Sequence, residues 1–281
     1  MLSFRSIGYM GRLGNQMFQF ASSVAIAKKT GHDIFFPLEN CTAVYPNGPI
    51  NPKTNSHTPV KCDLLDCFNI PASFFKRSAE INTGSIIKEK EFTFDPDMFN
   101  VQDGSDLHGF FQTEKYFKPI EDDIHRYFSF KPEIEESSTE YWSLNIEKFL
   151  EGNKSVSIHV RRGDYTLYPG HHPVCSDEYY SQAISRFGPE FRFLVFSDDL
   201  EWCRSKFISD RFFIVDSGDP FKDLKLMSMC DHHINANSSF SWWGSWLNRK
   251  EGKITICPSY WFGPMIDKNT KDVYCKEWEI I

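Results

Sequence analysis

Short apolar runs alternate with helical periodicity through the second half of the chain. The strand candidates are VSIHV, FRFLVFS, FFIVD, HHINA and KITICP, and all but the last precede a segment with helical spacing, such as SDEYYSQAISRF or FKDLKLMSMC. Strands separated by helices of this length form right-handed crossovers and a parallel sheet. We therefore expect residues 153–281 to form a doubly wound, Rossmann-like α/β domain that binds ligands beyond the carboxyl ends of its strands.

The first half of the chain shows the same alternation less regularly. We expect FRSIGYM to form a strand, GRLGN a turn, and residues 16–30 a helix with one apolar face. A second strand, DIFFP, precedes a stretch at 40–60 that is rich in Asn, Pro and Thr and is expected to be a loop. Residues 1–152 are thus predicted to form a second Rossmann-like domain, facing the first across a cleft.

Composition excludes several classes of protein. The chain has 281 residues and a net charge of −7, which argues against a general nucleic-acid binder. Its eight cysteines lack zinc-ligand spacing, although Cys62 and Cys67 are close enough in sequence for a disulfide. No apolar run approaches the roughly 20 residues of a spanning helix. We expect a cytoplasmic protein, with peripheral association at the inner face of a membrane left open and its oligomeric state unspecified.

The segment SVSIHVRRGDY carries the strongest candidate chemistry. In a strand, alternation places His159 and Arg161 on the same side, near the carboxyl end. A guanidinium at this position can bind a diphosphate and neutralise the charge that develops on a leaving group. The alternative is a structural ion pair between the arginines and Asp164.

A second candidate site lies at the start of a helix in DHHINANSSFSWWGSWLN. A short strand leads through Asn237, Ser238 and Ser239 into a helix whose first aromatic residue is Phe240. Backbone N–H groups and hydroxyls at a helix start bind anions, so this turn can hold the same diphosphate. The alternative is an ordinary N-cap before an aromatic core helix.

Two acidic residues and one glycine turn complete the candidates. Asp198 ends the strand FRFLVF and Asp223 lies near a helix start, where a carboxylate can accept hydrogen bonds from a ribose or from guanine. Each could instead cap a helix. In GRLGNQMFQFA, glycines that include Gly14 let the backbone approach a ligand, with Asn15 at the rim. A plain connection between strand and helix is the alternative.

We expect no metal and no cofactor. The pairs His171–His172 and His232–His233 are adjacent in sequence, so neither pair can chelate an ion by itself. The acidic pair in FDPDMF is only a weak match to a metal-binding DxD motif. Basic groups and helix ends can replace an ion electrostatically.

A set of segments spread over nearly the whole chain resembles the α-1,2-fucosyltransferases of glycosyltransferase family 11. The segments are, in order, GRLGNQMFQFA, GFFQTEKYF, SIHVRRGDY, FLVFSDD and INANSSFSWWGSWLN. The resemblance implies a GT-B fold and an inverting, metal-independent transfer from GDP-β-L-fucose to the 2-hydroxyl of a terminal galactose. It thereby implies two substrates, GDP-fucose and a galactose-terminated glycan, in the synthesis of a glycan or a surface polysaccharide such as an O-antigen.

The resemblance also implies roles for single residues. Related fucosyltransferases use the histidine and first arginine of this motif on the donor, which correspond to His159 and Arg161. In α-1,6 relatives an acid before the final motif and the serines of that motif contact the donor. The matching positions are Asp223, Ser238 and Ser239.

The acceptor side of the reaction is less defined. In protein O-fucosyltransferases a similar glycine turn supplies an asparagine beside the reacting sugar, which corresponds to Asn15. The base that accepts the acceptor proton is left open between Asp164, His159 and Glu114. Two other interpretations stay open, a fucosyltransferase with another linkage or acceptor and a sugar-binding protein without turnover.

Overall fold

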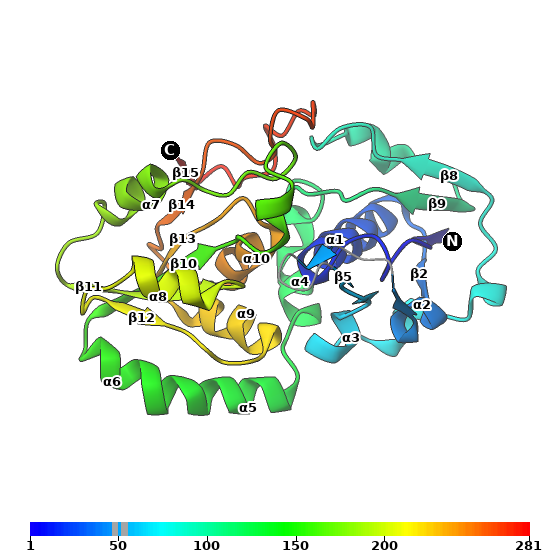
Figure 1. Ribbon diagram of the computed structural model, residues 1–281. Helices are drawn as coiled ribbons and strands as arrows, with labels where there is room; N and C mark the ends of the chain where they lie inside the picture. Colours follow the sequence, from blue (N-terminus) through cyan, green and yellow to red (C-terminus); the bar gives the residue numbers. More distant parts are fainter. Residues whose placement is uncertain (47–49, 52–55) are drawn as a thin grey trace. The chain divides into compact units, whose positions relative to one another are not determined.

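The computed structural model describes residues 1–46, 50–51 and 56–281. The chain forms two compact units. Unit 1 comprises residues 1–131 and 268–275, and unit 2 comprises residues 132–267 and 276–281 (Figure 1). The boundary that the sequence suggested, between residues 152 and 153, lies inside unit 2.

The helices before that expected boundary pack onto unit 2. They are α5 (Pro132–Tyr141), a π-helical turn η5 (Trp142–Ile146) and α6 (Glu147–Leu150). Ile146 and Leu150 belong to the same buried cluster as Leu226 and Met227 of the later helix α9 (Pro220–Met229). Leu194 and Phe196 of the unit 2 sheet belong to the same cluster, so the segment is part of unit 2. The division of acceptor and donor binding between the two units stays a prediction.

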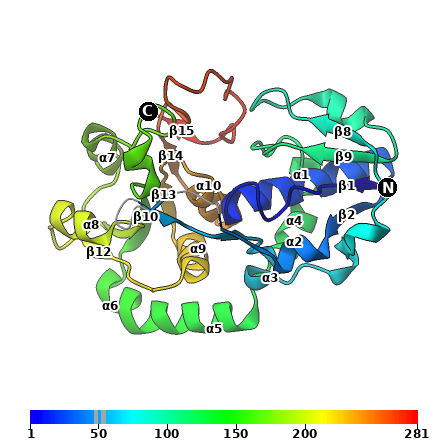
Figure 2. The ribbon, with the colours of Figure 1, turned by 45° about the vertical axis from the view of Figure 1, so that its right-hand side comes forward.

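Unit 1 contains a parallel sheet in the strand order β7-β2-β1-β9-β8. Its strands are β1 (Leu2–Ser3), β2 (Ile34–Pro37), β7 (Phe75–Lys76), β8 (Ser85–Lys88) and β9 (Ser105–His108). The chain order reverses between β1 and β9, so the loops after these two strands leave the sheet side by side (Figure 2).

The long helix α1 (Leu13–Thr30) follows β1 and confirms the expected helix. The expected strand FRSIGYM is wrong, because residues 5–9 form turns and the strand is Leu2–Ser3. Helix α1 ends at Gly31, whose φ of 72° lies in the left-handed region that favours glycine. From Leu13 to Ala27 every residue is buried except Asn15. A polar residue that stays partly exposed on such a helix lies where a ligand can reach it.

Short elements complete unit 1. The helices are α2 (Leu38–Thr42), α3 (Leu64–Cys67), α4 (Glu121–Tyr127), and the 3-10 turns η1 (Ala72–Phe74), η2 (Ser78–Glu80), η3 (Pro96–Asn100) and η4 (Lys118–Ile120). Two antiparallel pairs join β3 (Val44–Tyr45) to β6 (Val60–Lys61) and β4 (Ile50–Asn51) to β5 (Ser56–His57). These pairs occupy the loop expected at 40–60, of which residues 47–49 and 52–55 lie outside the described residues.

Unit 2 confirms the predicted doubly wound parallel sheet. Its strands are β10 (Lys154–Val160), β11 (Phe191–Ser197), β12 (Phe212–Ile214), β13 (His232–Ile234), β14 (Thr255–Cys257) and β15 (Glu279–Ile280). They are arranged as β12-β11-β10-β13-β14-β15, and every neighbouring pair is parallel. Counted from β10, this is the 3-2-1-4-5-6 order of the Rossmann fold.

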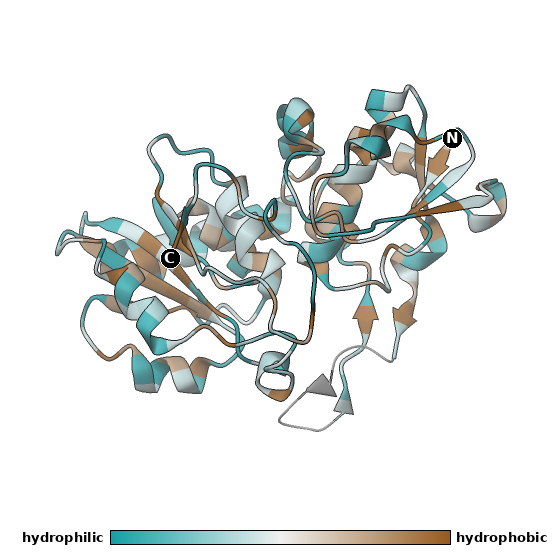
Figure 3. Cartoon of the chain, turned by 90° about the horizontal axis from the view of Figure 1, so that it is seen from above, coloured by the Kyte–Doolittle hydropathy of each residue, from teal (hydrophilic) through white to brown (hydrophobic). Residues whose placement is uncertain are grey.

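Helices cover both faces of this sheet. They are α7 (Asp177–Ile184), α8 (Leu200–Lys206), α9, α10 (Ser239–Leu247) and the 3-10 turn η6 (Asp164–Leu167). Figure 3 shows hydrophobic residues concentrated in the strands near the C-terminus and mostly hydrophilic residues in the loops around them. Among the residues that the structure describes, no helix is long and apolar enough to cross a bilayer.

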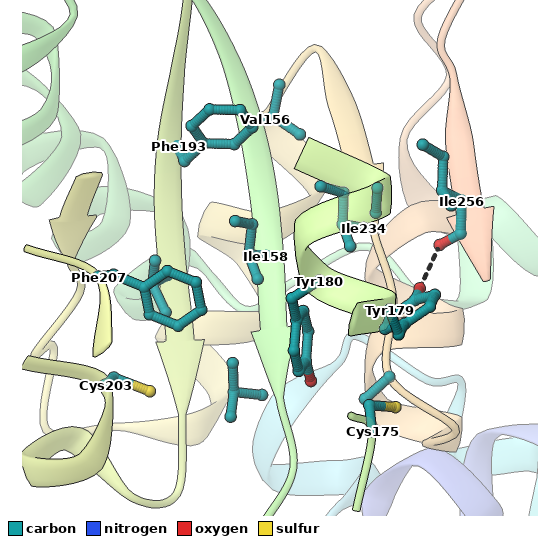
Figure 4. Packing of buried hydrophobic residues seen from close by; sticks show 14 of the residues in the cluster. Val156, Ile158, Cys175, Tyr179, Tyr180, Phe193, Cys203, Phe207, Ile234 and Ile256 are labelled. Carbon is teal, nitrogen blue, oxygen red and sulfur yellow. Dashed lines mark hydrogen bonds between the residues drawn. The ribbon is translucent and has the colours of Figure 1, made fainter. Parts of the chain in front are cut away.

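The core of unit 2 follows from the alternation along its strands. Val156 and Ile158 of β10 pack with Tyr179 and Tyr180 of α7 in one buried cluster (Figure 4). The hydroxyl of Tyr179 donates to the carbonyl of Ile256, 3.1 Å away, which satisfies this buried polar group. His159 therefore points to the opposite face of β10, as the sequence predicted.

The disulfide considered for Cys62 and Cys67 is not formed. Cys62 is a free and buried thiol. A buried thiol of this kind acts as a small apolar side chain.

Candidate active site

The two strongest sequence candidates meet at one edge of the sheet in unit 2. The strand order reverses between β10 and β13, and in open α/β sheets ligands bind beyond the carboxyl ends of the strands at such a point. Ile158 pairs with Ile234, so the segments that follow the two strands begin side by side. The predicted proximity of the arginine motif and the start of α10 is confirmed.

Arg161 is held by two carboxylates. Its Nη1 lies 2.7 Å from Oδ2 of Asp198, and its Nη2 donates to Oδ1 of Asp164. The guanidinium also lies 5.2 Å from the ring centroid of Tyr165, and its side chain is 17% exposed. The ion pair with Asp164, considered as an alternative, is therefore present. A guanidinium has five N–H donors, so two carboxylate contacts orient the group and leave donors for an anion.

Asp198 supports the turn that follows β10. Its Oδ1 accepts hydrogen bonds from the backbone N–H groups of Arg162 (2.9 Å) and Gly163 (3.2 Å), while its Oδ2 bonds to Arg161. A Cβ at Gly163 would lie 2.3 Å from that Oδ2, so any larger residue would displace the carboxylate. The expectation that Asp198 contacts the nucleotide stays untested, but the contacts within the protein give it a structural role.

The residues that cap α8 and α9 are close neighbours of Asp198 and Asp223, the acids that the sequence suggested as caps. Asp199, and not Asp198, is the N-cap of α8, and its side chain accepts from the N–H of Trp202. The N-cap of α9 is Asp219, and not Asp223. A cap requires a residue with extended backbone just before the helix, and sequence alone places helix starts only to within a residue or two.

Asp223 lies on α9, which follows β12 and so begins at the same edge of the sheet. The hydroxyl of Ser217 donates to its Oδ1 over 2.6 Å. Desolvation by burial raises the pKa of Asp223 to about 6. A desolvated carboxylate with a single hydroxyl donor is suited to accept further hydrogen bonds from a polar ligand, so the predicted contact with the donor is kept as a proposal.

His159 is buried and packs against the start of α10. Its ring centroid lies 5.6 Å from that of Phe240, and 5% of the residue is exposed. Burial lowers the pKa of His159 to about 4; the positive charge of Arg161 contributes to this shift, and the attraction of Asp198 opposes it. The imidazole is therefore neutral at physiological pH. Its Nδ1 is buried and has no hydrogen-bond partner within the described part of the chain.

The turn before α10 has the capping role that the sequence allowed. Ser238 is the N-cap, and its hydroxyl accepts from the N–H of Phe240 over 3.3 Å. The buried amide of Asn237 donates to the carbonyls of Pro173 (3.0 Å) and Trp261 (3.2 Å). Asn237, expected to contact the donor, thus shapes the turn through its side chain.

Ser239 is the first residue of α10, and it is partly exposed. The N–H groups of a first helical turn have no partner within the helix, and the helix dipole adds partial positive charge there. With Ser238 occupied as the cap, Ser239 and this first turn are the groups that remain for an anion.

Tyr165 connects the two segments, and sequence reasoning did not single it out. Its hydroxyl donates to the carbonyl of Asn237 over 3.2 Å, and its ring stacks on His172 at 4.9 Å between centroids. Burial raises the pKa of Tyr165 to about 12, so the hydroxyl stays protonated. Its position directly after the RRGD sequence was the available signal, because a residue there follows the arginine into the same turn.

Three of the predicted residues, Asn15, Gly14 and Glu114, belong to unit 1. Oδ1 of Asn15 accepts from Nε2 of Gln112 over 2.8 Å. Gly14 is buried in the first turn of α1, whereas a glycine is required at Gly11, where φ is 91° and a Cβ would lie 2.3 Å from Nδ2 of Asn15. Glu114 is buried, and its Oε2 lies 3.4 Å from Nζ of Lys118.

No group of three or more His, Cys, Asp or Glu residues is placed to hold an ion in the described ranges 1–46, 50–51 and 56–281. In FDPDMF, Asp95 caps a 3-10 turn by accepting from the N–H of Asp97. Independence of metal stays a prediction.

Solved structures define the class of fold. The fucosyltransferase NodZ from Bradyrhizobium matches with a TM-score of 0.53 at 12% identity, over 86% of this chain and 91% of that chain. POFUT1 in complex with GDP matches with a TM-score of 0.50 at 14% identity, over 90% and 98%. The fold is therefore that of the GT-B glycosyltransferases, as the resemblance implied. At these identities the likeness shows the fold alone.

The chain belongs to glycosyl transferase family 11, whose model matches residues 4–281. An alpha-1,2-colitosyltransferase from Escherichia coli is 29% identical over 280 residues, covering 90% of each protein. The O-antigen biosynthesis glycosyltransferase WbnK from Escherichia coli is 37% identical over 131 residues, covering 42% of this chain and 43% of that protein. Galactoside alpha-(1,2)-fucosyltransferase 2 from Sus scrofa is 24% identical over 256 residues, covering 86% and 69%. The relatives are named for two different sugars.

Proposed function

We propose that this chain is an inverting α-1,2-fucosyltransferase that moves L-fucose from GDP-β-L-fucose to the 2-hydroxyl of a terminal galactose. The observation that carries the proposal is the position of Arg161, which two carboxylates orient at the point where the strand order of unit 2 reverses. This is where a parallel sheet of this order binds a nucleotide. The relatives named for fucose transfer supply the sugar and the linkage.

The proposed chemistry requires stabilisation of the departing GDP. As the bond between C1 and the diphosphate breaks, negative charge grows on the diphosphate oxygens. Remaining N–H donors of Arg161 and the first turn of α10 neutralise that charge, and preorganised donors lower the barrier because they need no reorganisation. The acceptor hydroxyl attacks the opposite face of the sugar, which inverts the configuration at C1.

Of the three candidate bases, His159 is the one that is buried against the start of α10, where the diphosphate is proposed to bind. We therefore assign His159 to donor binding. The proton of the acceptor passes to Asp164 or Glu114, which a comparison of Asp164→Asn with Glu114→Gln separates.

The similarity to an alpha-1,2-colitosyltransferase supports a second candidate donor, GDP-colitose. We also expect the enzyme to act in the cytoplasm on a galactose-terminated glycan such as an O-antigen precursor, with association at the inner face of a membrane left open. Similarity to WbnK, which is named for O-antigen biosynthesis, supports this expectation.

A panel of nucleotide sugars tests the proposal. GDP-fucose, GDP-colitose, GDP-mannose and UDP-galactose are each mixed with lactose, with and without a chelator, and the linkage of any product is determined by NMR. We expect an α-1,2-fucosyl product whose yield the chelator does not change. Transfer from GDP-colitose alone supports the second candidate, and another linkage or no transfer from any donor contradicts both.

Substitution of Arg161 tests whether this residue stabilises the departing GDP. Arg161→Ala should lower kcat by about 10²- to 10³-fold, the range seen when one stabilising donor is removed. Arg161→Lys keeps the charge but not the fork that bonds to two carboxylates, so it should also be strongly impaired. Arg192→Ala, which removes a partly exposed arginine bonded to a backbone carbonyl, is the matched control. Near-normal kcat in Arg161→Ala would exclude Arg161 from the mechanism.

A further inference from the structure

A single carboxylate in unit 1 holds two consecutive backbone N–H groups. Glu89 directly follows β8, and its Oε2 accepts from the N–H of Phe110 at 2.7 Å while its Oε1 accepts from the N–H of Phe111 at 2.9 Å. Both donors lie in the loop that follows β9, the strand beside β8. The side chain therefore fixes the path of this loop just after it leaves the sheet.

The loop adopts a conformation that needs such support. Phe111 has a φ of 52°, in the left-handed region that a bulky residue seldom adopts. Its side chain is completely buried. At Gly109 a Cβ would lie 2.4 Å from Cβ of Glu89, so the loop approaches the carboxylate as closely as only glycine allows. Strain of this kind persists where the surrounding contacts hold it, and it is concentrated at functional sites.

The residue after the strained position contacts Asn15. Gln112 is buried, and its Nε2 donates to Oδ1 of Asn15 over 2.8 Å. Gln19 ties the same parts together, because its amide donates to the carbonyl of Met10 at 2.9 Å and to that of Gly109 at 3.3 Å. The glycine turn at the start of α1 and the loop after β9 thus form one hydrogen-bonded assembly.

This contact fixes which end of the Asn15 amide faces Gln112 and which end is turned away from it. A side-chain amide has an oxygen that accepts and a nitrogen that donates, and rotation by half a turn exchanges them. Nε2 of Gln112 donates in this contact, and the oxygen of Asn15 faces it. Nδ2 of Asn15 is then turned away from Gln112 and lies over Gly11, where an added Cβ would come within 2.3 Å of it.

We propose that Glu89 and Gln112 are positioning residues for Asn15: Glu89 fixes the loop, and Gln112 holds the Asn15 amide so that its Nδ2 donates to the reacting sugar. This inference rests on the proposed function, because the contact between Asn15 and the sugar is implied by the family resemblance. Neither Glu89 nor Gln112 touches the substrate in this scheme. Each acts through the orientation of Asn15.

The protonation state of Glu89 gives this assembly a pH dependence. Burial raises the pKa of Glu89 to about 7, and the nearby Glu91 raises it too, while its two backbone hydrogen bonds and Lys268 oppose the shift. Tyr116 also faces the carboxylate. Ionised Glu89 accepts from both N–H groups, whereas a protonated carboxyl has one oxygen that carries hydrogen and accepts poorly. The loop is therefore held above about pH 7 and loosened below it.

A double-mutant cycle tests the link between Gln112 and Asn15. Gln112→Leu keeps a similar volume and removes the donor, and we expect it to lower kcat about tenfold with little change in the donor KM. In the Asn15→Ala background, Gln112→Leu should change kcat by less than about twofold, because there is no amide left to orient. Equal costs in the two backgrounds overturn the proposal. Gln112→Glu, which is nearly isosteric and replaces the donor by an acceptor, should lower kcat similarly if Gln112→Leu does not fold.

The pH profile of kcat tests the part assigned to Glu89. The wild type should lose activity as the pH falls through about 7, and Glu89→Gln should lack this limb and be slower across the range. Glu91→Gln is the matched control, because it removes a neighbouring charge that bonds to Lys268 but not to the loop. A limb unchanged in Glu89→Gln, or lost equally in Glu91→Gln, overturns the assignment. A wild type that transfers no sugar from any donor contradicts the proposed function itself. A wild type that is active, with Asn15 and Gln112 substitutions whose effects simply add, contradicts only the positioning proposal.

Discussion

Replacement of Gly163 by alanine is the smallest change that should disable the candidate donor site. Gly163 lies in the turn after β10, and its own N–H donates to Asp198. A Cβ at this position would lie 2.3 Å from Oδ2 of Asp198, whereas ordinary contacts begin at 3.4 Å. The carboxylate must therefore withdraw by about 1 Å. That oxygen is the partner of Nη1 of Arg161.

The expected loss follows from the role of Arg161. A displacement of about 1 Å at a group that positions a reacting centre can cost about 100-fold in rate. We expect Gly163→Ala to lower kcat by about this factor. Asp198 is 28% exposed, so solvent screens its contacts and the loss of stability should be small, on the order of 1 kcal/mol.

The assay is release of GDP from GDP-fucose with lactose as the acceptor, together with thermal unfolding of each variant. Gly84→Ala is the matched control, because a Cβ there meets nothing within 4 Å. A kcat for Gly163→Ala within about twofold of the wild type would refute the reasoning. It would mean that the contact between Asp198 and Arg161 does not orient the guanidinium for catalysis.

Two further predictions concern stability. The folded-state pKa of His159, about 4, lies below its value of 6.5 in an unfolded chain, so the fold favours the neutral form and stability is lost as pH falls from 6.5 towards 4. At pH 5 this costs about 2 kcal/mol, so urea unfolding at pH 7.5 and pH 5 should show a smaller acid destabilisation in His159→Gln than in the wild type; equal losses would argue against a buried neutral imidazole. Asn237→Ala leaves the carbonyls of Pro173 and Trp261 without their amide donor and should lower the unfolding free energy by about 2 kcal/mol. An unchanged melting temperature for this variant would contradict the structural role of Asn237.

The sequence by itself determined the local elements of unit 2 and most of its candidate site. The side chains of Val156, Ile158 and Val160 alternate with polar ones, and this pattern alone predicted a buried strand with His159 on its other face. The repeated strand and helix periods predicted a parallel sheet. These signals are encoded in neighbouring residues, so they can be read without knowing the fold.

The tertiary structure decided which strands are neighbours and what each polar side chain does. The sheet places β13 beside β10 although about 70 residues separate them, and this pairing brings Arg161 and the start of α10 to one edge. The support of Arg161 by Asp198 and the hold of Glu89 on the loop before Gln112 also depend on contacts between distant segments. Local periodicity carries no information about such contacts, because hydrogen bonds of this kind form only once packing has brought the partners together.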